Sequence, residues 1–155
     1  LRLAVKRGLI MIRNRYTSLI NSREYQAATC NEEARQSANN RLAEIGAIDG
    51  KGKPNEEFIT EHAQNNGQSF IRRYIAYFGG TDEALTAVNT LIDMYDNEQY
   101  IAMYFYLAIL YGQIDWRVPG LLSCLPVNMD GLIIYLDIFL NTAKGCIDEQ
   151  EDMSK

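Results

Sequence analysis

The few side chains that could act as a nucleophile or a general base lie far apart in the sequence. His62 is the single histidine, and the three cysteines are Cys30, Cys124 and Cys146. A Ser–His or Cys–His mechanism would have to use His62, which falls one helical turn after Phe58 on an apolar face. Neither Cys30 nor Cys124 has the helix N-terminal or basic setting that lowers a thiol pKa. We therefore expect a packed histidine and no catalytic residue.

The spacings typical of metal and cofactor sites are also missing from the sequence. No CxxC or Cys/His pair occurs, and the acidic pair Asp93 and Asp96 has no adjacent histidine or third carboxylate. The glycine-rich stretch at residues 46–55, GAIDGKGKPN, matches neither GxxxxGK[ST] nor GxGxxG. The sequence predicts that the protein is no enzyme and takes no metal or cofactor.

The tyrosines indicate that the protein binds another protein rather than catalysing a reaction. Five of the ten tyrosines lie within residues 95–111, and three of them, spaced +4 and +7, share one face of a predicted helix. Tyrosine, tryptophan and arginine are enriched at interface hot spots. An alternative stays open, in which these tyrosines line the core and the single tryptophan closes one end of it. The predicted partner-binding residues are Tyr100, Tyr104, Tyr111, Trp116 and Arg117.

Charge is unevenly distributed along the chain. The net charge is −5, from 15 basic and 20 acidic side chains. Residues 1–73 contain 12 basic and 8 acidic side chains, a net charge of +4, and residues 74–155 contain 3 and 12, a net charge of −9. This asymmetry indicates either an electrostatic partner or two halves that neutralise each other within one fold.

The basic half offers a second binding hypothesis. Residues 31–48, NEEARQSANNRLAEIGAI, resemble the recognition helix and following turn of winged helix-turn-helix proteins, including some phage regulators. The resemblance implies a polar helix in the major groove and a wing tip at residues 50–53 on a phosphate. The nucleic-acid-binding residues that it implies are Arg35, Asn39, Asn40, Arg41, Lys51 and Lys53.

The elements that must position these residues are helices. The opening segment places an apolar stripe on one helix face and basic residues on another. The stripe consists of Val5, Leu9, Ile12, Tyr16 and Leu19, and the basic residues are Arg2, Lys6 and Arg13.

Later helices are predicted from their caps and stop signals. We expect helices that run from Asn21 to about Ile45, from Asn55 to a stop at residues 65–67 (Asn-Asn-Gly), from Ser69 to Gly79, and from Thr81 onward. A strongly apolar helix, expected to be the central one, follows at residues 97–112, and the last helix opens near Asn128 and closes at Gly145. The helix predicted from Thr81 has the core stripe Leu85, Val88, Ile92 and Tyr95.

Together these signals predict an all-α fold, a single compact bundle of six or seven helices. Residues 47–59 are the one place where a small two-stranded wing fits. The predicted organisation is a basic helical pair at residues 1–46, a loop at 47–54, a bundle core at 55–147 and a frayed acidic tail at 148–155.

We therefore expect a protein that binds another macromolecule. The first hypothesis is a small bacterial or viral adaptor, inhibitor or immunity-type protein with an acidic, tyrosine-rich contact surface. The second is a nucleic-acid-binding protein that uses the basic half, and a homo-oligomer is left open. The scattered cysteines favour a cytoplasmic location, whereas the arginine-rich opening favours an organellar matrix. The longest apolar run, 11 residues from Ile101 to Tyr111, is too short to cross a bilayer.

Overall fold

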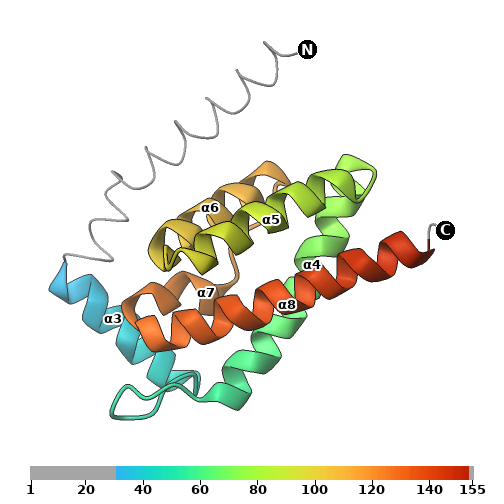
Figure 1. The fold of residues 1–155 in the computed structure, drawn as a ribbon. Coiled ribbons are helices and arrows are strands. Elements are labelled where there is room, and N and C mark those ends of the chain that lie inside the picture. The colour runs from blue at the N-terminus through green and yellow to red at the C-terminus, as the bar shows by residue number, and fades with distance from the viewer. Residues whose placement is uncertain (1–30, 154–155) are drawn as a thin grey trace.

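The computed structural model of the chain describes residues 31–153, and this part is all-α, as predicted (Figure 1). The opening helix predicted from Val5 to Leu19 and the thiol of Cys30 lie outside the described residues. Six α-helices and one 3₁₀ turn follow one another without a strand in residues 31–153. They are α3 (Glu32–Glu44), α4 (Glu56–Phe78), α5 (Asp82–Asp96), α6 (Tyr100–Gln113), α7 (Gly120–Cys124), η1 (Leu125–Val127) and α8 (Met129–Met153).

Asparagine side chains start the first two of these helices. The Oδ1 atom of Asn31 accepts a hydrogen bond from the Ala34 amide at 3.1 Å, and that of Asn55 accepts one from the Phe58 amide at 3.3 Å. Each bond satisfies an amide that has no partner within its own helix. Asn31 has an extended backbone, so the prediction of one continuous helix from Asn21 to Ile45 is wrong at this residue.

The predicted loop after α3 is confirmed, and its turn is held by Asp49. The carboxylate accepts hydrogen bonds from the amides of Lys51 at 2.8 Å and Lys53 at 2.9 Å. These bonds stabilise the charged carboxylate and lower the pKa of Asp49 below its ordinary value. The predicted wing is not confirmed, because one isolated β-bridge, between Ile48 and Pro54, is all the pairing seen here, and residues 56–59 belong to α4.

Helix α4 runs through the predicted stop at residues 65–67 and ends only at Gly79, whose φ of 77° is left-handed. Gly67 lies where α8 crosses α4, and a Cβ added there would be 3.1 Å from the Phe139 carbonyl oxygen. The side-chain amide of Asn66 donates a hydrogen bond of 2.6 Å to the Tyr135 hydroxyl. Both residues therefore serve the packing of the two helices, and the prediction that they end the helix is wrong.

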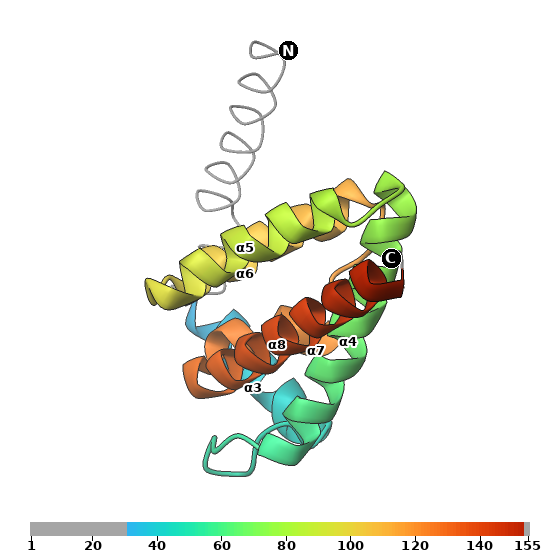
Figure 2. The ribbon, with the colours of Figure 1, turned by 45° about the vertical axis from the view of Figure 1, so that its right-hand side comes forward.

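Helices α4 and α8 pack against each other more extensively than any other pair in the described part. Figures 1 and 2 show α5 and α6 side by side as a second layer beside this pair. Helix α6 packs mainly on α5 and only slightly on α8, yet Gly112 is its one exposed residue, so the predicted burial of this strongly apolar helix is confirmed.

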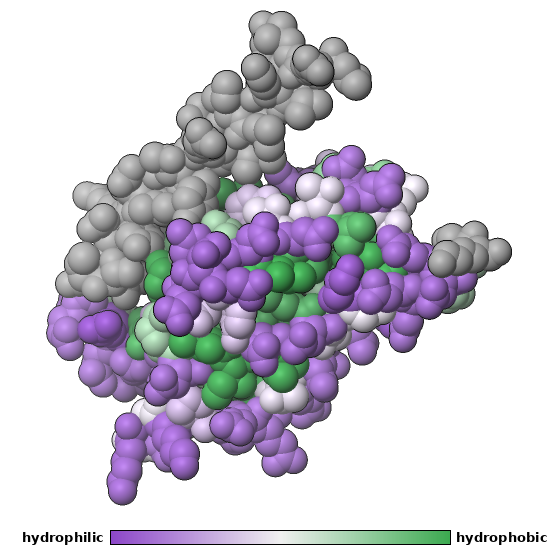
Figure 3. Space-filling view, viewed as in Figure 1, coloured by the Kyte–Doolittle hydropathy of each residue, from purple (hydrophilic) through white to green (hydrophobic). Residues whose placement is uncertain are grey.

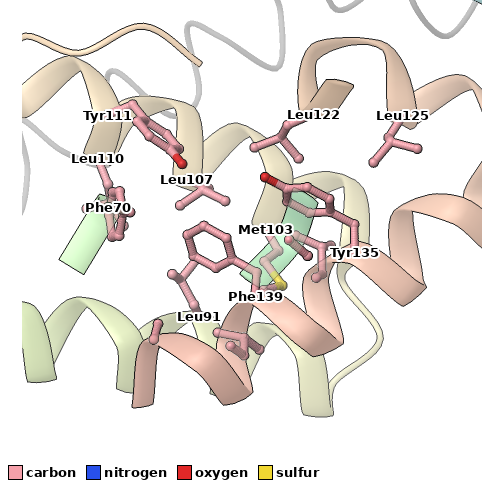
Figure 4. Packing of buried hydrophobic residues seen from close by; sticks show 14 of the residues in the cluster. Phe70, Leu91, Met103, Leu107, Leu110, Tyr111, Leu122, Leu125, Tyr135 and Phe139 are labelled. Atoms are coloured by element: carbon pink, nitrogen blue, oxygen red, sulfur yellow. The ribbon is translucent and has the colours of Figure 1, made fainter. Parts of the chain in front are cut away.

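Aromatic rings fill the space between the two layers (Figure 4). The ring of Phe70 on α4 lies 4.8 Å from that of Tyr111 on α6 and 5.5 Å from that of Phe139 on α8. Tyr135 stacks on Phe139 at 6.0 Å. Ring pairs at these separations add to the stabilisation from apolar burial, so this cluster joins α4, α6 and α8.

Two elements differ from their predicted extent or orientation. Helix α8 continues past Gly145 to Met153, so the predicted closure at Gly145 and the frayed tail are wrong over residues 148–153. Helix α5 is rotated from its predicted stripe. Its fully buried side chains are Ala84, Ala87, Val88 and Leu91, whereas Leu85 and Ile92 are only partly buried.

Candidate functional site

The three tyrosines predicted to share a binding face lie at different depths. Tyr111 is fully buried at 0% exposure, with its ring against Phe70 and Trp116. Burial raises the pKa of Tyr111 far above its ordinary value. Among the described residues, its hydroxyl has no hydrogen-bond partner. Tyr111 is therefore a core residue, and its prediction as a partner-binding residue is wrong.

Tyr100 and Tyr104 are partly buried at the edge of the core. The ring of Tyr100 lies 5.3 Å from that of Tyr95, and the ring of Tyr104 lies 4.9 Å from that of Phe105. Burial raises the pKa of Tyr104 to about 12. These two tyrosines pack mostly within the fold, which agrees with the alternative that the tyrosines line the core.

Trp116 follows the end of α6, and its ring contacts both a core tyrosine and an arginine. The indole lies 5.3 Å from the ring of Tyr111. The guanidinium carbon of Arg73, on α4, lies 4.3 Å from the centre of the indole, which is a cation–π contact. The adjacent Asp115 has a positive φ of 52°, and Arg117 is exposed. The partly exposed Trp116 thus lies at the surface together with Arg73, which no sequence pattern indicated.

Two exposed aromatic side chains extend this surface to the end of α4. Tyr77 is 57% exposed and Phe78 is 40% exposed, and their rings lie 5.0 Å apart. Tyr77 follows Arg73 by one helical turn and therefore shares its face. We call Arg73, Tyr77, Phe78 and Trp116 the aromatic corner.

The aromatic corner is anchored to the core from below. The ring of Phe78 lies 4.8 Å from that of Tyr74, and the Tyr74 hydroxyl donates a hydrogen bond of 3.3 Å to Gln113. Tyr74 is buried, and burial raises its pKa to about 12. The sequence contained one signal of this site. The aromatic residues Tyr77 and Phe78 stand directly before the Gly79–Gly80 stop, and the end of a helix is a place where the core no longer covers such side chains.

The residues of the nucleic-acid hypothesis lie on α3 and the following loop. Most of their side chains are exposed, and Asn39 is partly buried. The same helix exposes three glutamates, and a hollow beside it is lined by two of them. The hollow's lining residues are Glu33, Gln36, Ser37, Asn40, Arg41, Glu44 and Ile45. One arginine against two carboxylates does not favour a phosphate.

In the part of the chain that the structure describes, the groups that could perform catalysis are not brought together. The His62 ring stacks on Phe58 at 4.2 Å, and its Nδ1 atom lies 3.0 Å from the Phe58 carbonyl oxygen. Burial raises the pKa of the Cys146 thiol, which disfavours the nucleophilic thiolate. No group of three or more histidine, cysteine or acidic side chains in residues 31–153 could hold a metal ion.

No protein-family model, curated protein or solved structure matches this chain. None of the helices in the described part is long and apolar enough to cross a membrane. The aromatic corner is therefore interpreted from its own geometry.

Proposed function

We propose that this protein acts by binding another protein at the aromatic corner and performs no chemistry of its own. The observation that carries the proposal is the Arg73–Trp116 stack with Tyr77 and Phe78 exposed beside it. An adaptor, an inhibitor or an immunity-type protein would act in this way.

The composition and support of the corner favour a protein partner. Tryptophan, tyrosine and arginine carry a large share of the binding energy at protein interfaces. The ring of Trp116 rests on Tyr111, and that of Phe78 rests on Tyr74, so these two rings are held in place before a partner arrives. A surface that is already ordered loses less conformational entropy on binding.

Nucleic-acid binding through α3 is less well supported. The helix has exposed Arg35 and Arg41 but also Glu32, Glu33 and Glu44, so its own net charge is negative. A helix of this net charge attracts a phosphate backbone poorly.

Alanine substitution at the corner tests the proposal on the protein that co-purifies from the native host. After nuclease treatment, we expect a protein to be recovered, and we expect Tyr77→Ala to weaken its binding roughly thirtyfold, as loss of a hot-spot side chain does. Trp116→Ala should weaken it at least as much. Binding constants from calorimetry with the identified partner give the measurement, and circular dichroism confirms that each variant is folded.

Ile45→Ala is the matched control, because Ile45 is also an exposed apolar residue, at 41%, but lies after α3. It should leave the binding constant unchanged. Equal losses in all three variants would contradict a site at the corner. Recovery of nucleic acid alone, abolished by Arg35→Glu with Arg41→Glu, would instead support the alternative.

A further inference from the structure

Helix α5 presents a stripe on the flank that faces α8 in which two partly buried apolar residues alternate with exposed polar ones. Its stripe has the spacing +3, +4, +3, +4, which keeps residues on one side of a helix. Thr90, which hydrogen-bonds Tyr106 of α6, lies on the opposite flank, and α5 also packs on α8. The stripe consists of Asp82, Leu85, Asn89, Ile92 and Asp96.

Helix α8 has a matching stripe on the side that faces α5. Asp137 lies close enough to Tyr95 of α5 to contribute, after burial, to the raised pKa of that tyrosine. Residues three or four apart from Asp137 therefore share the α5 side of α8. The stripe consists of Asp130, Ile133, Asp137, Leu140, Lys144 and Asp148.

Between the two helices these stripes form one surface, which we call the α5–α8 strip. Figure 3 shows hydrophobic residues between hydrophilic ones on this face. Leu85, Ile92 and Ile133 are partly exposed there. The stripes contain five aspartates and a single lysine, and Lys144 already pairs with Asp148 at 3.6 Å. The strip therefore suits an apolar helix face with positive charges along its edges.

The first twenty residues of this chain have that chemistry. They contain five basic and no acidic side chains, and residues 31–153 contain 8 basic and 19 acidic ones, a net charge of −11. The apolar stripe from Val5 to Leu19 repeats at helical spacing, with Arg2, Lys6 and Arg13 on another face. The segment is therefore complementary to the strip in charge and has an apolar face to cover its partly exposed apolar side chains.

The chain is also long enough for this contact. Figures 1 and 2 both place the start of α3 at the end of the molecule where α5 ends and α8 begins. Residues 20 to 31 can span up to about 36 Å, and a twenty-residue helix is about 30 Å long. These lengths allow the segment to reach the strip from Asn31.

We propose that residues 1–20 bind along the α5–α8 strip of the same molecule as a basic amphipathic helix. The apolar stripe covers Leu85, Ile92 and Ile133, and the arginines and Lys6 pair with the aspartates at the edges. The basic and acidic halves of the chain then neutralise each other inside one fold. This surface is separate from the aromatic corner, so the two proposals stand or fall independently.

Zero-length carbodiimide coupling of amines to carboxylates tests the proposal on the full chain. We expect Lys6 to couple to Asp137 or to another aspartate of the strip within one chain, as identified by mass spectrometry of the monomer band. Absence of any such link would contradict the proposal. Links found only between chains would also overturn it, because the segment would then belong to a second copy.

Amide hydrogen exchange gives a second measurement with matched variants. In the wild type we expect residues 3–20 to exchange at least about tenfold more slowly than in the variant Asp82→Asn/Asp96→Asn/Asp137→Asn, because an isolated helix of this length is only marginally stable. Salt of about 1 M should remove part of the protection. The control neutralises three carboxylates elsewhere, by Glu33→Gln, Glu44→Gln and Glu61→Gln, and should retain it. Equal exchange in the two variants would rule out the strip as the binding surface.

Discussion

Two buried tyrosines show how much a single hydrogen bond matters in this core. Tyr111 and Tyr135 are both at 0% exposure. The hydroxyl of Tyr135 accepts a hydrogen bond from Asn66, whereas the hydroxyl of Tyr111 has no partner within residues 31–153. A buried polar group without a partner costs free energy because it has lost its bonds to water.

The substitution Tyr111→Phe should therefore stabilise the protein or leave it unchanged, with a gain of up to about 1 kcal/mol in the free energy of unfolding. Tyr135→Phe leaves the Asn66 amide without its acceptor and should cost about 1 kcal/mol. Urea unfolding followed by circular dichroism measures both changes. A loss in Tyr111→Phe as large as that in Tyr135→Phe would show that the Tyr111 hydroxyl does have a partner.

At the level of the helices, the glycines Gly67 and Gly145 differ in how closely neighbouring atoms approach them. A Cβ at Gly67 would lie 3.1 Å from the Phe139 carbonyl oxygen and 3.2 Å from Cβ of Thr142, whereas a Cβ at Gly145 would have nothing within 4 Å. Alanine gains about 1 kcal/mol over glycine in an exposed helix. At a close crossing, the overpacking costs about 1–3 kcal/mol.

Gly145→Ala should therefore raise the melting temperature, and Gly67→Ala should lower it, because α4 and α8 must move apart to admit the methyl group. Thermal unfolding by circular dichroism compares the two variants directly. An increase for Gly67→Ala as large as that for Gly145→Ala would mean that the two helices do not depend on this close approach.

The same glycines show why element boundaries were only partly predictable. Caps are local, so the helix starts at Asn55 and Thr81 were predictable from the sequence alone. A glycine within a helix ends it or admits a neighbouring helix, and only the tertiary contact with α8 decides this for Gly67. The stop predicted at Gly67 failed for this reason, whereas α8 continues through Gly145 with no close neighbour at that position.

Of the aromatic corner, Trp116 was predictable from the sequence, next to the exposed Arg117 outside the corner, but the remainder was not. A tryptophan and an arginine in a connection between helices are unusual enough to notice in the sequence. Tyr111 shares the residue type and the helical spacing of a binding face, yet its helix turns it towards Phe70. Arg73 and Tyr77 became part of the site only because α4 continues past Gly67 and ends beside Trp116.

For the whole molecule, the dominance of the α4–α8 pair predicts where stability is concentrated. These helices bury most of the aromatic cluster, whereas α3 contributes one buried side chain, Leu42. We expect the amides of Phe70 and Phe139 to exchange at the rate set by global unfolding and those of α3 to exchange faster through local opening. Native-state hydrogen exchange measures this order. The slowest exchange in α3 would contradict it.

The position of the only tryptophan gives the molecule a built-in optical reporter. Because the indole of Trp116 lies against both the buried Tyr111 and the guanidinium of Arg73, its fluorescence senses both the interior and the surface. Unfolding would shift the emission to the red as water reaches the ring, and a partner that displaces Arg73 would change its intensity without that shift. One unlabelled spectrum can thus distinguish ligand capture from denaturation.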